Sequence, residues 1–176
     1  MMTSNFSTIP VLGFAAASGT GKTTLITQVL PLLKASGLRV GLVKHSHHNF
    51  DIDHVGKDSF RLREAGATPV VLVSKYRRAI IEEFYHQTEP ELASQLALFS
   101  PEQVDLILVE GFRSEAFAKI ELHRPSLGQA LLYPNDNHII ALASDSTLDT
   151  PPHIPLLDLN QPAEIAAFIL QTFLKS

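Results

Sequence analysis

Short apolar runs rich in valine, isoleucine and leucine recur along the chain, and segments with helical spacing separate several of them. These runs predict strands at residues 11–16, 39–44, 69–74, 79–84, 105–109, 119–122, 138–143 and 155–159, with 79–84 at a sheet edge. Helical spacing predicts helices at residues 23–34, 57–65, 90–99 and 162–174. Strands that are apolar throughout are typical of a parallel sheet buried on both faces. We therefore expect an α/β fold with a doubly wound, mostly parallel sheet and flanking helices.

The composition fits one ordinary globular domain. The chain has 176 residues, of which 45% are hydrophobic, so we expect a single domain over residues 10–176 and a disordered N-terminal extension over residues 1–9. A net charge of -4 without a long basic stretch argues against nucleic-acid binding. The absence of cysteine excludes thiolate metal sites and indicates a reducing compartment. No apolar run reaches the length of a membrane span, so we expect a cytoplasmic protein without a membrane partner.

A glycine-rich turn connects the first predicted strand to the first predicted helix. Glycines, a lysine, a hydroxyl and a helix start together form a nucleotide phosphate loop of the P-loop NTPase type. The candidate nucleotide-binding residues of this loop are Ser18, Gly19, Thr20, Gly21, Lys22, Thr23 and Thr24. Lys22 is also a candidate catalytic residue, and the Thr23 hydroxyl is a candidate magnesium ligand. Ala16 stands where the usual pattern begins with glycine, so we expect the chain to enter the loop at a different angle.

A polar segment, residues 44–53, follows the second predicted strand. Since the carboxyl ends of parallel strands line the ligand crevice, we expect Lys44 and His45 to face the nucleotide. Three histidines, His45, His47 and His48, leave open a zinc or nickel site. Asp51 and Asp53 share one alternating face and are candidates for holding magnesium through water, with Asp53 our choice as a metal-site residue. The charges of residues 56–66 fit a solvated helix face.

Two further carboxylates follow buried strands. Residues 105–112 resemble a Walker B strand, in which Glu110 would contact the magnesium shell or orient water; we treat it as a metal and catalytic candidate. Arg113 would stabilise charge on a phosphoryl group or is an ordinary surface arginine. Asp145 ends the strand 138–143 and would accept hydrogen bonds from guanine, a base that presents two adjacent donors. The usual guanine-reading sequence is not matched, so ATP stays an alternative to GTP.

Four blocks in the same order resemble one known family. They are residues 15–24 (AAASGTGKTT), 44–53 (KHSHHNFDID), 56–67 (GKDSFRLREAGA) and 105–112 (DLILVEGF). From about Pro10 to Asp145 the chain is similar to the MobB family, the molybdopterin-guanine dinucleotide biosynthesis adaptor proteins. Arg113 departs from the lysine common in that family, which puts any lysine-specific role there in doubt.

The resemblance implies a function and partners. Members of that family bind GTP, hydrolyse it weakly at most, form homodimers, and assist the enzyme that attaches GMP to molybdopterin. We therefore expect GTP and Mg²⁺ as cofactors, and a molybdenum cofactor guanylyltransferase and molybdopterin-handling proteins as partners. Two alternatives from the residues themselves stay open: a metallochaperone-type GTPase that uses the histidine-rich loop, and a small-molecule kinase. The lack of a long arginine-rich lid segment argues against the kinase.

Overall fold

The computed structural model describes residues 8–46, 49–86 and 89–175, which form two compact units. The larger unit comprises the chain up to His45 and from Glu91 onward, and the smaller unit comprises Ser46–Pro90. Within the described ranges no helix is long and apolar enough to cross a membrane. The extension expected at residues 1–9 lies outside the described residues as far as residue 7, whereas Ile9 is buried.

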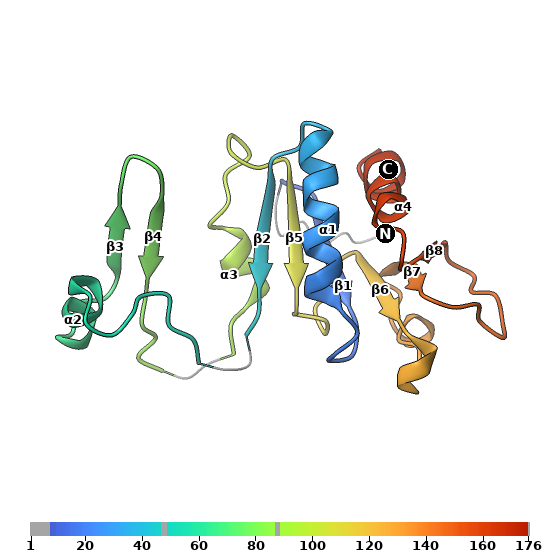
Figure 1. Cartoon of the computed structure of the whole chain (residues 1–176), viewed down its shortest axis with the longest axis horizontal. Helices are drawn as coiled ribbons and strands as arrows, with labels where there is room; N and C mark the ends of the chain where they lie inside the picture. Colours follow the sequence, from blue (N-terminus) through green and yellow to red (C-terminus); the bar gives the residue numbers. More distant parts are fainter. Residues whose placement is uncertain (1–7, 47–48, 87–88, 176) are drawn as a thin grey trace. The chain divides into compact units, whose positions relative to one another are not determined.

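A six-stranded parallel sheet forms the centre of the larger unit (Figure 1). Its strand order is β2-β5-β1-β6-β7-β8. The strands are β1 (Val11–Ala15), β2 (Val40–Lys44), β5 (Leu106–Glu110), β6 (Lys119–His123), β7 (Ile139–Ser144) and β8 (Leu156–Asp158). Every pair in this sheet is parallel. The predicted mostly parallel α/β fold is thus confirmed.

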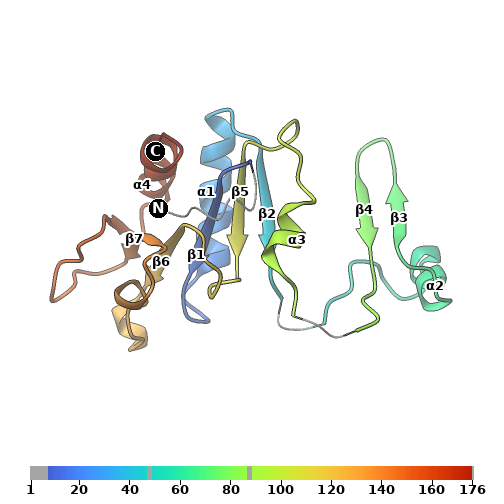
Figure 2. The ribbon, with the colours of Figure 1, turned by 180° about the vertical axis from the view of Figure 1, so that it is seen from behind.

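Helices cover the sheet on both faces, as Figures 1 and 2 show from opposite sides. One cluster packs α1 (Lys22–Ala35) and α4 (Pro162–Phe168) on the sheet, and the other packs α3 (Leu92–Leu96). The side chains of β5 alternate between the clusters, because successive strand residues point to opposite faces. Leu106 and Leu108 belong to the first cluster, and Ile107 and Val109 belong to the second. All four are completely buried, so β5 is a central strand of the core.

Strands 69–74 and 79–84 do not extend this sheet. In the smaller unit, β3 (Val70–Val73) and β4 (Arg78–Ile81) form a separate antiparallel pair, preceded by α2 (Asp58–Glu64). The connection between the strands is only four residues long, and the Ser74 amide donates to the Arg77 carbonyl across it at 2.9 Å. Parallel strands need a crossover of a dozen residues or more, so this short connection allows only an antiparallel hairpin.

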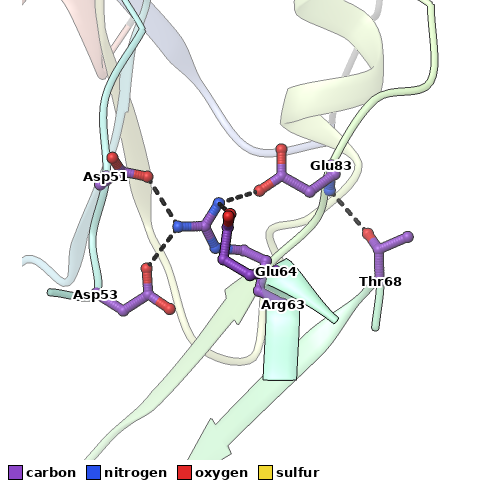
Figure 3. Close-up of polar contacts among 6 residues, drawn as sticks. All are labelled: Asp51, Asp53, Arg63, Glu64, Thr68 and Glu83. Carbon is purple, nitrogen blue, oxygen red and sulfur yellow. Dashed lines mark hydrogen bonds and ion pairs between the residues drawn. The ribbon is translucent and has the colours of Figure 1, made fainter. Parts of the chain in front are cut away.

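A charged cluster organises the described part of the smaller unit (Figure 3). Arg63 Nη2 donates to Asp51 Oδ1 at 2.9 Å and Asp53 Oδ1 at 3.1 Å, and Nη1 donates to Glu83 Oε1 at 2.7 Å. Asp53 is the one buried residue among those described in this unit. Asp51 and Asp53, both suggested as magnesium-binding residues, are therefore ion-paired with Arg63 here.

Candidate functional site

The carboxyl ends of β1, β2 and β5 meet at one edge of the central sheet. Glu110, the last residue of β5, pairs with Lys44 at the end of β2. On its other side it pairs with Phe14, one residue before the end of β1. The chain leaves β1 directly into the glycine-rich loop and enters α1 at Lys22. The fold thus brings the loop, the end of β2 and the Walker B-like strand together, as the sequence predicts for a nucleotide site.

Two glycines give the loop its shape. Gly19 and Gly21 have φ angles of 80° and 99°, in the left-handed region that other residues disfavour. Gly21 is the residue before α1, and its carbonyl accepts the Leu25 amide at 2.9 Å. Ala16 has no such requirement, because Phe112 is the only non-glycine residue with positive φ in the described ranges. The alanine at position 16 is therefore accommodated without strain.

Lys22 folds back over the loop. Its Nζ lies 3.1 Å from the carbonyl oxygens of both Ala16 and Ala17, and Thr20 Oγ1 donates to the Ala17 carbonyl at 2.9 Å. Burial lowers the pKa of Lys22, Glu110 opposes this shift, and the cations Arg113 and Lys44 add to it. Lys22 therefore interacts electrostatically with two other cations and one carboxylate beside the loop. This excess of positive charge is suited to binding a polyphosphate.

Thr23, Glu110 and Lys44 form a hydrogen-bonded triad beside the loop. Thr23 Oγ1 donates to Glu110 Oε1 at 2.8 Å, and Lys44 Nζ lies 3.3 Å from Thr23 Oγ1 and 3.2 Å from Glu110 Oε2. A hydroxyl and a carboxylate are the oxygen ligands that Mg²⁺ prefers. The pair therefore has the donor chemistry of a magnesium site, and Lys44 neutralises the carboxylate where no cation is bound.

A sharp bend follows Glu110. Gly111 has a φ of 109°, and a side chain there would place its Cβ 2.5 Å from the His45 Cβ. The His45 ring stacks on Phe112 with a centroid distance of 4.7 Å, and its amide donates to the Glu110 carbonyl at 2.8 Å. His45 is therefore packed at the end of β2, next to the triad.

Arg124 is a residue that the sequence analysis missed. It follows β6 and joins two parts of the candidate site: Nε donates to the Thr20 carbonyl at 2.9 Å, and Nη1 pairs with Asp145 Oδ2 at 2.6 Å. Ser146 Oγ donates to the other oxygen of Asp145 at 3.1 Å. The signal that would have found Arg124 is its position directly after a central strand, the criterion that selected Asp145 after β7.

The remaining predicted site residues are distributed as follows. Ser18, Gly19 and Thr24 are exposed on the loop and on the first turn of α1. His47 and His48 lie outside the described residues, and the described ranges contain no cluster of three or more histidine or acidic side chains that fits a metal ion. An open cleft of about 380 Å³ adjoins Asp145, lined by residues that include Ser146, Asn160 and Glu164.

Comparison with known proteins gives a consistent result. Residues 11–145 match the family model described as "Molybdopterin guanine dinucleotide synthesis protein B". The chain is 43% identical over 166 residues to the molybdopterin-guanine dinucleotide biosynthesis adapter protein of Escherichia coli (strain K12), covering 93% of each chain. It is 41% identical to the adapter protein of Haemophilus influenzae, covering 92% of this chain and 88% of that protein.

Solved structures agree with the fold. A crystal structure of molybdopterin-guanine biosynthesis protein B superposes with a TM-score of 0.68 at 26% identity, covering 91% of this chain and 97% of that chain. The crystal structure of Bacillus subtilis MobB superposes with a TM-score of 0.73, covering 92% of this chain and 96% of that one. At 22% identity the latter likeness supports the fold alone.

Proposed function

The chain belongs to the molybdopterin guanine dinucleotide synthesis protein B family, and we propose that it is a GTP-binding adaptor in molybdenum cofactor biosynthesis. In this role it assists the guanylyltransferase that attaches GMP to molybdopterin, and it works in the cytoplasm. The observation that carries the proposal is the assembly of Lys22, Thr23 and Glu110 at one sheet edge. Relatives at 43% and 41% identity are named as adapter proteins of this pathway.

The loop would hold the triphosphate through groups that now bond within the protein. The Lys22 ammonium would exchange the Ala16 and Ala17 carbonyls for phosphate oxygens, to which charge-assisted bonds are stronger. Thr23 and Glu110 would hold Mg²⁺, which neutralises phosphate charge when it is bound. Asp53, also predicted as a metal-site residue, would have to release Arg63 before it could bind a metal ion.

Asp145 is the proposed reader of guanine. Its carboxylate would accept both adjacent donors of the base, and adenine does not offer that pair. Arg124 and Ser146 already fix one oxygen each, so the carboxylate is held in one orientation at the mouth of the adjoining cleft. The cleft volume of about 380 Å³ lies in the range of ligand pockets, roughly 300 to 1,000 Å³.

Hydrolysis is proposed to be slow. Glu110 would hold Mg²⁺ together with Thr23, and is therefore not free to orient an attacking water. The guanidinium of Arg113 makes no hydrogen bond to another residue in the described ranges, so nothing there holds it against a γ-phosphate. A partner would have to supply the missing group, as trans-acting proteins do for other P-loop GTPases.

A competition titration tests the nucleotide proposal. We expect calorimetry to show tighter binding of GTP than of ATP, and weaker binding of GTP when Mg²⁺ is removed. Asp145→Asn should cost GTP about tenfold in affinity, because one acceptor becomes a donor that faces the base. Asp149→Asn, which makes the same chemical change at an exposed aspartate outside the cleft lining, is the matched control. Absence of GTP binding, or equal affinity for ATP, would contradict the proposal.

The apolar face of the smaller unit supports a homodimer. Val71, Val73 and Ile80 are 52%, 77% and 54% exposed, and Val71 lies opposite Ile80 in the β3–β4 pair. These side chains therefore share one uncovered face of the hairpin, and we propose that a second copy covers it. Ile80→Lys should shift the protein from dimer to monomer in sedimentation analysis. Val55→Lys, at a residue 84% exposed outside the hairpin, should not; a dimer unaffected by Ile80→Lys would refute this interface.

A further inference from the structure

A second cavity lies beside the phosphate loop, separate from the Thr23–Glu110–Lys44 triad. It has a volume of about 60 Å³. Ala16, Ala17 and Thr20 form one wall, the end of β6 and the segment that follows it form another, and Arg113 completes the lining. Room for a water needs about 15 Å³, so the cavity has room for roughly four such positions. That is the size of a tetrahedral oxyanion and is too small for a base or a sugar.

His123 is one of three buried polar residues that line this cavity, together with Thr20 and Glu121. His123 is 8% exposed and lines the cavity, yet no hydrogen bond joins its imidazole to another residue within the described ranges. Its neighbour on the same strand face, Glu121, is not available, because the amides of Leu132 and Tyr133 each donate to one of its carboxylate oxygens at 2.8 Å. The ring nitrogens of His123 are not among the completely buried side-chain atoms of the described residues, so a ligand or water in the cavity can bond to them.

Two arginines line the cavity together with the Glu121 carboxyl group, whose pKa is raised by burial. Arg124 uses Nε and Nη1 on Thr20 and Asp145, which fixes the guanidinium and leaves Nη2 without a hydrogen bond to another described residue. Arg113 also lines the cavity. Lys119 Nζ donates a hydrogen bond to the backbone carbonyl of Arg113 at 2.9 Å, and the Arg113 guanidinium makes no hydrogen bond to another described residue. The lining therefore offers unpaired donors on two cations and an imidazole, which is the chemistry that recognises phosphate.

We propose that this cavity binds the phosphoryl group of a second ligand, held by His123, Arg113 and Arg124, at the same time as a nucleotide occupies the phosphate loop. The shared chemistry is a dianionic tetrahedral oxyanion, either as free inorganic phosphate or as the phosphomonoester end of a small molecule. The site goes beyond nucleotide binding, because it gives the adaptor a place for a second phosphorylated compound next to the nucleotide.

The test is a titration of inorganic phosphate and, separately, glycerol phosphate, into full-length protein saturated with GDP and Mg²⁺, followed by histidine NMR signals. We expect saturable binding that shifts the His123 signal, which is identified by its loss in His123→Gln. A monoester that binds more tightly than inorganic phosphate points to a phosphorylated small molecule, and the reverse order points to the free ion. Either order supports the site.

Variants separate this site from the phosphate loop. His123→Gln and Arg113→Gln should each weaken phosphate binding by about tenfold or more. His138→Gln, an exposed histidine outside the cavity lining, should not. Lys22→Ala, titrated without nucleotide, should still bind phosphate. This arm of the test therefore does not depend on whether the phosphate loop binds GTP. Binding that is lost in Lys22→Ala but kept in Arg113→Gln, or no saturable binding in the wild type, overturns the proposal.

Discussion

In the larger unit the central sheet buries leucine, isoleucine and phenylalanine side chains on both faces, whereas the described part of the smaller unit buries only Asp53. The polar interactions of the two units differ in the same way. At the sheet edge, the Thr23–Glu110–Lys44 triad is added to a fold that the apolar core already holds together. In the smaller unit, the Arg63 cluster takes the place of a core (Figure 3).

This difference teaches which polar groups are available to a ligand. A unit with a large apolar core can leave Lys22 bonded only to carbonyl groups, because its stability does not depend on that contact. The 45 residues of the smaller unit cannot supply such a core. Its charges are engaged in ion pairs within the unit instead, and its apolar side chains are largely exposed.

The largest effect on stability should come from a substitution that creates a cavity in the core of the larger unit. Leu108 is completely buried in the cluster beneath α1 and α4, so Leu108→Ala should lower the free energy of unfolding by about 2–5 kcal/mol. Leu72→Ala, at a residue 39% exposed on β3, should change it by less than about 0.5 kcal/mol. Urea unfolding of dilute protein measures both. If Leu72→Ala instead lowered the free energy of unfolding by as much as Leu108→Ala, the smaller unit would have a core of its own.

The next effect concerns ligand binding without a change in stability. Lys22→Ala removes one charge-assisted contact to phosphate, worth about 1.5–3 kcal/mol, and should weaken GTP binding by roughly 10- to 100-fold. The urea midpoint should stay within error of wild type, because among the described residues the lysine side chain hydrogen-bonds only to the carbonyls of Ala16 and Ala17. Lys34→Ala, at the far end of α1, is the control and should leave GTP affinity unchanged. A large stability loss in Lys22→Ala would mean that the lysine supports the fold.

The Arg63 cluster should behave in the opposite way. Arg63→Ala leaves the buried Asp53 carboxylate without its cation, so amide hydrogen exchange in residues 51–83 should accelerate by about tenfold or more. Exchange in β1 and β5 should stay unchanged. Arg61→Ala provides the comparison, because its side chain is 76% exposed and contacts only Asp58 among the ion pairs described. Equal exchange in the two variants would rule out the cluster as the organising contact.

How far the sequence predicts this molecule depends on the range of each interaction. The phosphate loop is a contiguous strand, turn and helix, so Thr23 is recognised from neighbouring residues alone. Glu110 and Asp145 follow from the rule that strand ends share one sheet edge. The contacts of Arg124 depend on how the loop and two strand ends fold together, which no local spacing encodes. Arg63 has the pattern of a surface helix charge because the three carboxylates to which it donates hydrogen bonds, Asp51, Asp53 and Glu83, lie outside α2.

The smallest effect should be a dependence on acid in the larger unit. The hydrogen bonds from Arg39 lower the pKa of Asp105 to about 2, from an ordinary value of 3.8. The pair links the residue before β2 to the residue before β5, with Arg39 Nη2 2.6 Å from Asp105 Oδ1. A carboxyl group with a lowered folded-state pKa adds stability above its unfolded pKa, and this stability is lost as the pH falls through the folded value.

The stability difference between wild type and Asp105→Asn should therefore be constant above about pH 5 and shrink between about pH 4 and pH 2. The difference should be small, because both side chains reach solvent, with exposures of 49% and 34%. Urea titrations at several pH values measure it, and Glu102→Gln serves as the control because only its backbone carbonyl contacts Arg39. If the difference instead grew as the pH fell, Asp105 would be protonated in the folded protein, and Arg39 would be held in place by the carbonyl groups of Pro101 and Glu102 alone.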